Sequence, residues 1–204
     1  FDGDGDRMLA IDRSGRIHDG DDLIGLIAHH LKGEGKLEGG VAVTVMSNYG
    51  FHQAMEEAGI ETATTAVGDR YVLEALREKG WSLGGEQAGH IIWSEYVPTG
   101  DGIGAALLTM QALAGRDLAE TEAISKLPQR LDAVKIADRG ALDNAKDLHA
   151  AIEKESAALE GRGRVLVRPS GTEPLVRIMV EAPTDEECVE ILGRLMAAAQ
   201  AELA

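Results

Sequence analysis

The chain has 204 residues, which is enough for one or two domains of about 150 residues each, and 44% of them are hydrophobic, which suffices for a folded core. With 27% charged residues and only 5 prolines, its composition excludes disordered, collagen-like and mucin-like proteins. The formal net charge of −15 repels phosphate backbones and anionic lipids, so we expect neither a nucleic acid nor a membrane surface as a partner.

Strands and helices alternate over the first 127 residues. Apolar runs predict strands at residues 8–11, 41–46, 60–67, 81–83 and 91–93. Helical spacing predicts helices after a cap at Asp21, around 51–58, at 69–79, from Thr99, and at 117–127, where Pro128 ends the last one. This alternation is typical of a mixed or parallel sheet covered by helices, so we predict a mixed-sheet α/β domain.

A smaller α+β domain is predicted from Pro128 onward. The pattern there indicates strands at 131–136, 164–168 and 175–181 and helices at 141–159 and 184–203. The single cysteine, Cys188, has acidic neighbours that raise the pKa of a thiol, and we interpret it as a buried residue in a reducing cytoplasm. The longest apolar runs, such as 103–110, fall well short of the roughly 20 residues that span a bilayer.

An acidic loop opens the chain. Asp2, Asp4 and Asp6 alternate with glycines, and three hard carboxylate ligands suit Mg²⁺ or Ca²⁺. An EF-hand is excluded because Arg7 and Arg13 stand where that motif needs Gly and Glu. A solvated acidic turn is the alternative. Arg7 favours the metal site, since a cation beside a metal cluster can help to hold a phosphoryl group.

Two further loops are candidates for ligand binding. The loop at 84–90 places the carboxylate of Glu86, an amide and the imidazole of His90 between two apolar strands, where they could bind hydroxyls. The alternative is a plain hairpin with a core histidine. The loop at 67–71 lies at a junction of strand and helix, where ligands gather in α/β folds. There, Asp69 could instead be a simple helix cap.

A phosphate cradle is predicted at residues 168–174. Arg168 and Arg177 supply two guanidinium groups, and the loop between them adds two hydroxyls and the backbone N–H groups around a glycine. The alternative is an ordinary hairpin turn with arginines at its strand ends.

Taken in order, these loops resemble the motifs of the α-D-phosphohexomutase superfamily. The motifs are Asp-Gly-Asp-Gly-Asp-Arg from residue 2, Val-Gly-Asp-Arg-Tyr from 67, Gly-Gly-Glu-Gln-Ala-Gly-His from 84, Thr-Gly-Asp-Gly from 99 and Arg-Pro-Ser-Gly-Thr-Glu-Pro from 168. The resemblance spans essentially the whole chain. Glu86-Gln87, with the motif at 99–102, favours the branch that acts on glucosamine phosphates over phosphomannomutase/phosphoglucomutase.

The resemblance implies a Mg²⁺-dependent isomerase that interconverts glucosamine 6-phosphate and glucosamine 1-phosphate through a phosphoserine enzyme and a bisphosphate intermediate. Such an activity feeds the synthesis of amino-sugar nucleotides and cell-wall precursors. It also implies three parts of this chain: a metal loop with the end of a preceding domain at 1–16, a sugar-binding third domain at 17–127 and a phosphate-binding fourth domain at 128–204. A homodimer is left open.

The resemblance also assigns roles to individual residues. The implied metal ligands are Asp2, Asp4 and Asp6. The implied catalytic residues are Arg7, which holds the transferring phosphoryl group, and His90, which transfers a proton. The implied substrate-binding residues are Gly68, Asp69 and Glu86 at the sugar, and Arg168, Ser170, Gly171, Thr172 and Arg177 at the phosphate that does not react.

Two departures from the superfamily pattern are visible. Ala88 stands where serine is common, so one hydroxyl contact to the ligand is either missing or made by water. No Ser-His-Asn-Pro-like phosphoserine motif occurs in the sequence, so we expect the chain by itself to be inactive and to work with N-terminal domains of the same enzyme. Two readings compete with a mutase fragment: a metal-binding module and a non-catalytic phosphosugar-binding protein.

Overall fold

The chain forms two compact units, Phe1–Lys126 and Leu127–Ala204, each with a hydrophobic core of its own. The structure is a computed structural model, and it describes residues 1–136, 140–171 and 173–203. No helix in these ranges is long and apolar enough to cross a membrane.

The first unit is built on a four-stranded mixed sheet with the strand order β4-β3-β5-β6. Its strands are β3 (Val41–Thr44), β4 (Thr62–Thr65), β5 (Leu83–Gly85) and β6 (Ile91–Trp93). Strand β3 runs parallel to β4 and β5, whereas β6 is antiparallel to β5. The predicted mixed-sheet α/β fold is therefore confirmed.

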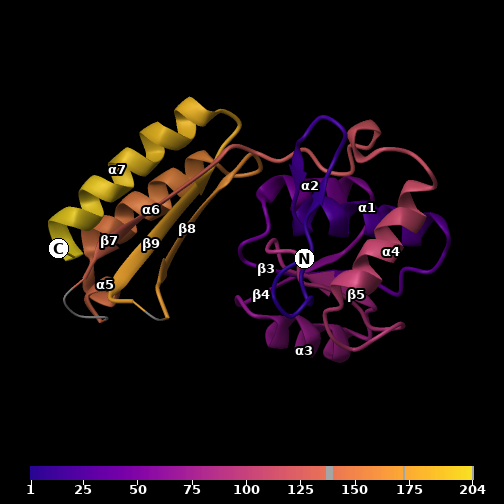
Figure 1. Ribbon diagram of the computed structural model, residues 1–204. Coiled ribbons are helices and arrows are strands. Elements are labelled where there is room, and N and C mark those ends of the chain that lie inside the picture. The colour runs from indigo at the N-terminus through magenta and orange to yellow at the C-terminus, as the bar shows by residue number, and fades with distance from the viewer. Residues whose placement is uncertain (137–139, 172, 204) are drawn as a thin grey trace. The chain divides into compact units, whose positions relative to one another are not determined.

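Four helices surround this sheet. Figure 1 shows α1 (Gly20–Gly33) and α2 (Tyr49–Glu57) on one side of it and α3 (Asp69–Lys79) on the other. Helix α4 (Gly102–Leu113) packs against α1 and β6. The apolar stripe of α1 explains this arrangement, because its four side chains are all buried in the core: Leu23, Ile24, Ile27 and Leu31.

A short hairpin connects the acidic loop to α1. It consists of β1 (Ala10–Ile11) and β2 (Ile17–His18), paired antiparallel. Asp12 closes its turn, because its Oδ1 accepts hydrogen bonds from the backbone N–H groups of Ser14 at 2.8 Å and Arg16 at 3.0 Å. The acidic loop therefore precedes a firmly bonded turn.

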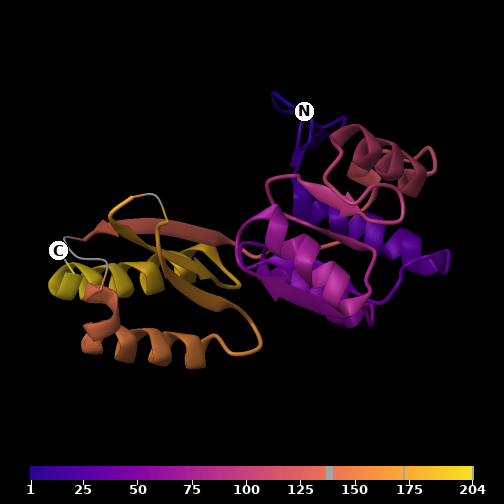
Figure 2. The same ribbon diagram turned by 90° about the horizontal axis from the view of Figure 1, so that it is seen from below.

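The second unit is an antiparallel sheet with helices on one face (Figure 2). Its strands are β7 (Gln129–Lys135), β8 (Arg164–Pro169) and β9 (Leu175–Glu181), in the order β7-β9-β8. Its helices are α5 (Ala141–Asn144), α6 (Lys146–Ala158) and α7 (Asp185–Leu203). Cys188 is buried in this core, as predicted, and burial raises the pKa of its thiol. The predicted α+β character of this unit is confirmed.

Several predicted boundaries are wrong. The helix predicted at 117–127 is only a short 3-10 turn, η1 (Leu118–Glu120). Leu118 and Ile124 are both buried, and their spacing would put them on different sides of a helix, so an extended segment buries both. The cap of α1 is Asp19 and not Asp21. The helix predicted at 141–159 is divided at Ala145 into α5 and α6.

Candidate functional site

The acidic loop brings its three carboxylates together. Oxygen atoms of Asp2, Asp4 and Asp6 all lie within 4.8 Å of one another. Oδ1 of Asp6 is buried and accepts no hydrogen bond from any described residue. A buried acceptor without a donor is costly, and a hard cation would satisfy it. The donor set and this orphaned oxygen therefore fit Mg²⁺ or Ca²⁺.

Arg7 is held beside these carboxylates. Its Nε donates to Oδ2 of Asp2 at 2.7 Å and lies 3.5 Å from Oδ1 of Asp6. The bond to Asp2 raises the pKa of the guanidinium. Burial raises the pKa of Asp2, but its hydrogen bonds with Arg7 outweigh this and lower the pKa overall. The carboxylate of Asp2 and the guanidinium of Arg7 therefore stabilise each other in their charged forms.

His90 also reaches the acidic loop. It forms an isolated β-bridge with Arg7, and its Nδ1 lies 3.2 Å from Oδ2 of Asp6. The imidazole is buried, and its Nε2 has no hydrogen-bond partner in the described parts of the chain. A Cβ added to Gly100 would overlap this ring, so the motif at 99–102 needs its glycine to make room for His90. The two implied catalytic residues therefore lie side by side.

The two predicted sugar loops are joined by one hydrogen bond. Oε1 of Glu86 accepts the backbone N–H of Gly68 at 3.0 Å. Gly68 has a φ of 129°, which only glycine adopts readily, and it is the N-terminal cap of α3. Asp69 is the first residue of that helix, so the alternative interpretation of Asp69 as its cap is wrong.

The start of α1 supports the loop at 84–90 from behind. The backbone N–H of Gly20 donates to the carbonyl oxygen of Gln87 at 2.9 Å, and that of Met8 donates to the carbonyl oxygen of Gly89 at 3.1 Å. A Cβ at Gly20 would overlap the backbone oxygen of Glu86. The sequence analysis missed Gly20 because only the folded chain brings residues 20 and 86 together.

An open cavity of about 270 Å³ lies between the acidic loop and the sugar loop. Its lining includes Asp2, Arg7 and Ala88. Ala88 is exposed on this side, so its methyl group occupies a position from which a serine could have reached a ligand. The cavity is thus lined by one cation, by one carboxylate of the acidic loop and by Ala88 of the loop at 84–90, and a guanidinium at its wall suits an anionic ligand such as a phosphate.

The second unit contains the predicted phosphate loop. Arg168 and Arg177 stand directly opposite each other in the β8–β9 register. Arg177 is paired with Glu173, whose Oε2 accepts from its Nη2 at 3.1 Å, so the two cations and this carboxylate lie together at the end of the hairpin. Ser170 is buried, and its Oγ accepts the backbone N–H of Glu173 at 3.3 Å. Gly171 has open space around its Cα, and Thr172 lies outside the described residues.

Comparison with protein families identifies both units. The phosphoglucomutase/phosphomannomutase alpha/beta/alpha domain III matches residues 19–131, and the C-terminal domain of the same family matches residues 131–198. A phosphoglucosamine mutase from Parafrankia sp. is 52% identical over 95% of this chain and 42% of its own length. The Bacillus subtilis phosphoglucosamine mutase is 45% identical over 100% of this chain and 46% of its own length.

Solved structures show the same fold. The Aspergillus fumigatus N-acetylphosphoglucosamine mutase in complex with GlcNAc-6P and magnesium superposes with a TM-score of 0.79 at 23% identity, over 100% of this chain and 48% of that one. A phosphoglucomutase/phosphomannomutase family protein from Burkholderia thailandensis gives a TM-score of 0.78 at 24% identity, over 99% and 46%. The chain thus spans about half the length of the relatives it matches.

Proposed function

Because the chain belongs to the phosphoglucomutase/phosphomannomutase family, whose domain III and C-terminal domain it carries, we propose that it is the substrate-binding part of a cytoplasmic phosphoglucosamine mutase. The reaction would interconvert glucosamine 6-phosphate and glucosamine 1-phosphate. The observation that carries this proposal is the cavity where Arg7, the acidic loop and the sugar loop meet. Relatives of 45–52% identity that are phosphoglucosamine mutases support the choice of sugar.

We assign Mg²⁺ to Asp2, Asp4 and Asp6, whose oxygens lie within 4.8 Å of one another. When bound, the ion would neutralise charge on a phosphoryl group. Arg7, fixed by Asp2, would orient that group from the side. His90 would hold or release a proton at Nε2, since Asp6 already contacts its Nδ1.

Glu86 would bind a sugar hydroxyl with Oε2, because Oε1 is engaged by Gly68. The opposed guanidinium groups of Arg168 and Arg177 would bind the phosphate that does not react. A distant phosphate grip contributes binding energy that orients the reacting end of the substrate. A non-catalytic phosphosugar-binding protein would use the same loops, but it would have no use for three carboxylates that repel a phosphate.

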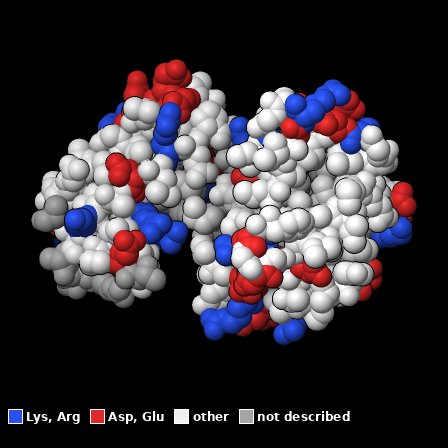
Figure 3. Space-filling view, viewed as in Figure 1, with Lys and Arg blue, Asp and Glu red and all other residues white. Residues whose placement is uncertain are grey.

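The nucleophile of the reaction, a phosphoserine, would come from the N-terminal domains of the same enzyme. Helix α4 offers a surface on which these domains would pack. Ile103, Leu107 and Met110 form an exposed stripe along α4 at helical spacing, and the surface over this helix is largely uncharged (Figure 3). A Cβ at Gly102, the first residue of α4, would lie 3.0 Å from the ring of Phe1. Contact with a second copy is the alternative use of the stripe.

Glu86→Ala is expected to weaken the binding of glucosamine 6-phosphate roughly tenfold or more, because a hydrogen bond to a charged group contributes about 1.5–3 kcal/mol. Calorimetric titration of the purified chain measures this. The control is Glu74→Ala, an exposed glutamate on α3. We expect the wild-type affinity to be weak without the rest of the enzyme, and no turnover. Equal affinities for wild type and Glu86→Ala would remove Glu86 from the site, and absence of any sugar-phosphate binding would contradict the proposed function.

Asp4→Asn is expected to lower the affinity for Mg²⁺ at least tenfold without changing the fold, because Asp4 is exposed and its carboxylate is a metal ligand in our assignment. Titration with Mg²⁺ and circular dichroism measure the two effects. Asp143→Asn, which neutralises an exposed aspartate in the other unit, controls for the change in net charge. An unchanged Mg²⁺ affinity in Asp4→Asn would contradict the metal site.

A further inference from the structure

Two carboxylates at the loop at 84–90 have no cationic partner. Both are tied to Gly68, because Glu86 accepts its backbone N–H at 3.0 Å and Asp69 follows it in the chain. In the described parts of the chain, neither Asp69 nor Glu86 forms an ion pair with a lysine, arginine or histidine. The acidic loop differs in this respect, since Asp2 is paired with Arg7 at 2.7 Å. The negative charge beside Gly68 is therefore left for a ligand to compensate.

The arginine that follows Asp69 in the sequence is held by other groups. Nη2 of Arg70 donates to the hydroxyl of Tyr71 at 2.8 Å, and its guanidinium carbon lies 4.6 Å from the centre of the Tyr71 ring. Nε of Arg70 lies 3.9 Å from Oε1 of Glu74. Asp69 receives the backbone N–H of Arg70 instead, which donates to Oδ1 at 2.8 Å. One oxygen of Asp69 is thus bound by a neutral donor, and the adjacent guanidinium leaves its charge uncompensated.

The fold places Asp69 at the edge of the sheet where ligands bind. Strands β4 and β5 both run parallel to β3, so the loops that follow them lie at the same edge, and these loops carry Gly68 and Glu86. Asp69 is exposed there as the first residue of α3. A Cβ on Gly68 would lie 3.4 Å from Cδ2 of Tyr71, so the Tyr71 ring packs beside the same glycine. Asp69 and Glu86 can therefore contact one ligand.

We propose that Asp69 selects sugar phosphates that carry a protonated amine, and that Tyr71 is a positioning residue that holds Arg70 where it does not neutralise Asp69. Glucosamine phosphates carry an ammonium group, whereas glucose phosphates carry a hydroxyl at that carbon and N-acetylglucosamine phosphates a neutral amide. An ammonium would offset the charge of the two carboxylates, and its N–H groups would form charge-assisted hydrogen bonds. This inference rests on the proposed function and names the residue that sets its sugar preference.

The test compares the affinities of the purified chain for three ligands: glucosamine 6-phosphate, glucose 6-phosphate and N-acetylglucosamine 6-phosphate. NMR titration at pH 7 measures them even where they are weak. We expect the wild type to bind the amine at least about fivefold more tightly than either neutral ligand, because only the amine forms charge-assisted bonds. Asp69→Asn keeps the size of the side chain and should bring the ratio of affinities close to one. Glu78→Gln, which neutralises an exposed carboxylate on the same helix, should keep the wild-type ratio. A merely structural role of Asp69 would weaken all three ligands alike and leave the ratio unchanged.

The pH and a second variant give further readouts. The amine of the ligand is expected to titrate near the value of an α-amino group, about 8, so the preference of the wild type should disappear at about pH 9.5. Asp69→Asn should show no such loss, because it has no preference to lose. Tyr71→Phe removes the hydroxyl that binds Nη2 of Arg70 and should lower the ratio, because the guanidinium can then turn toward Asp69.

The outcomes separate this inference from the proposed function. An equal ratio in the wild type and Asp69→Asn would overturn the inference. So would a preference that Glu86→Gln removes and Asp69→Asn keeps, since the ammonium would then belong to Glu86. Binding of all three ligands without a preference for the amine would also overturn it, but would leave the sugar-phosphate site standing. If the wild type bound none of the three, the proposed function would fail and this inference with it.

Discussion

Asp21→Asn is expected to increase the free energy of unfolding at neutral and alkaline pH and to remove a decline in stability between about pH 4 and 7. Asp21 is fully buried, and this burial raises the pKa of its carboxyl group to about 7, although the backbone N–H of Asn48 donates to it at 2.9 Å and opposes the shift. The folded state thus binds the proton more tightly than the unfolded state, whose carboxyl titrates near 3.8.

The sign follows from this difference. Below about pH 4 both states are protonated and Asp21 carries no penalty. As the pH rises toward 7 the unfolded state loses its proton first, so the folded state becomes relatively less stable. Above pH 7 the loss in the free energy of unfolding is constant. It amounts to about 4 kcal/mol, because each pKa unit of the shift corresponds to about 1.4 kcal/mol. The side-chain oxygen of asparagine at position 21 still accepts the backbone N–H of Asn48. Because this side chain carries no charge, the variant does not lose stability as the pH rises.

Urea unfolding of wild type and Asp21→Asn between pH 4 and 9 measures the effect. The two curves should meet near pH 4 and diverge with increasing pH, with the variant more stable. Asp143→Asn, at an exposed position, should follow the wild type throughout. Parallel curves for Asp21→Asn and the wild type would mean that the pKa of Asp21 lies near its ordinary value and that burial does not raise it.

The sequence predicted the fold class and the family because both depend on local patterns. The four-residue stripe of α1 and the β-branched run of β3 are fully buried, as their spacing required. The ordered motifs led to the phosphohexomutase superfamily, and the matches to domain III and the C-terminal domain confirm it. The roles of the individual site residues remain predictions.

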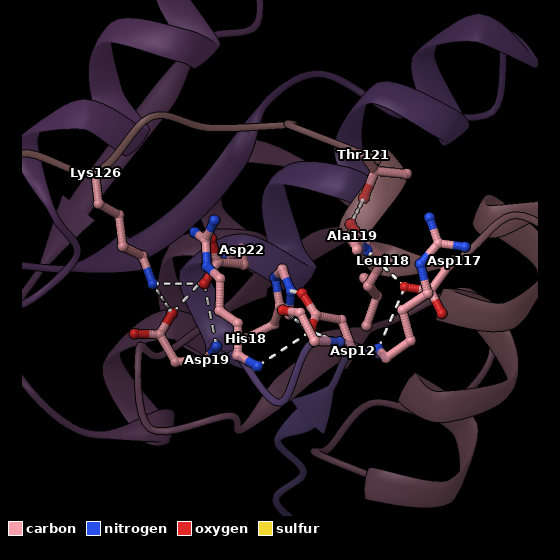
Figure 4. Close-up of polar contacts among 12 residues, drawn as sticks. Asp12, His18, Asp19, Asp22, Asp117, Leu118, Ala119, Thr121 and Lys126 are labelled. Atoms are coloured by element: carbon pink, nitrogen blue, oxygen red, sulfur yellow. Dashed lines mark hydrogen bonds and ion pairs between the residues drawn. The ribbon is translucent and has the colours of Figure 1, made fainter.

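The contacts that assemble the site could not be predicted, because they join residues far apart in the chain. Glu86 bonds to Gly68, 18 residues earlier, and Lys126 to Asp19, across 107 residues (Figure 4). The helix cap was assigned to the wrong aspartate because Asp19-Gly20-Asp21-Asp22 offers three capping side chains in one turn. Only the folded backbone decides: Asp19 is extended and accepts the N–H groups of Asp21 and Asp22, whereas Asp21 enters the core.

Gly20→Ala is expected to destabilise the first unit by about 3 kcal/mol, at the upper end of the usual cost of overpacking, and to reduce the binding of glucosamine 6-phosphate at least tenfold. An added methyl group would overlap the backbone oxygen of Glu86 and lie 2.9 Å from the backbone nitrogen of Gly89 and 3.0 Å from the backbone oxygen of Gln87. None of these atoms is the end of a flexible side chain. Either α1 or the whole loop at 84–90 must therefore move, and the bonds from Gly20 to Gln87 and from Gly68 to Glu86 must distort with it.

Gly33→Ala, at the other end of the same helix, is the matched control. A Cβ there would meet no heavy atom of the described chain within 4 Å, and alanine favours a helix over glycine by up to about 1 kcal/mol. Urea unfolding should therefore show Gly33→Ala at least as stable as the wild type and Gly20→Ala far less so, with sugar-phosphate binding lost only in the latter. If both variants behaved alike, the start of α1 would not support the sugar loop. Weakened binding in Gly20→Ala with unchanged stability would mean that the loop at 84–90 shifts at little energetic cost. Gly20 would then matter for the position of the ligand-binding loop but not for the stability of the first unit.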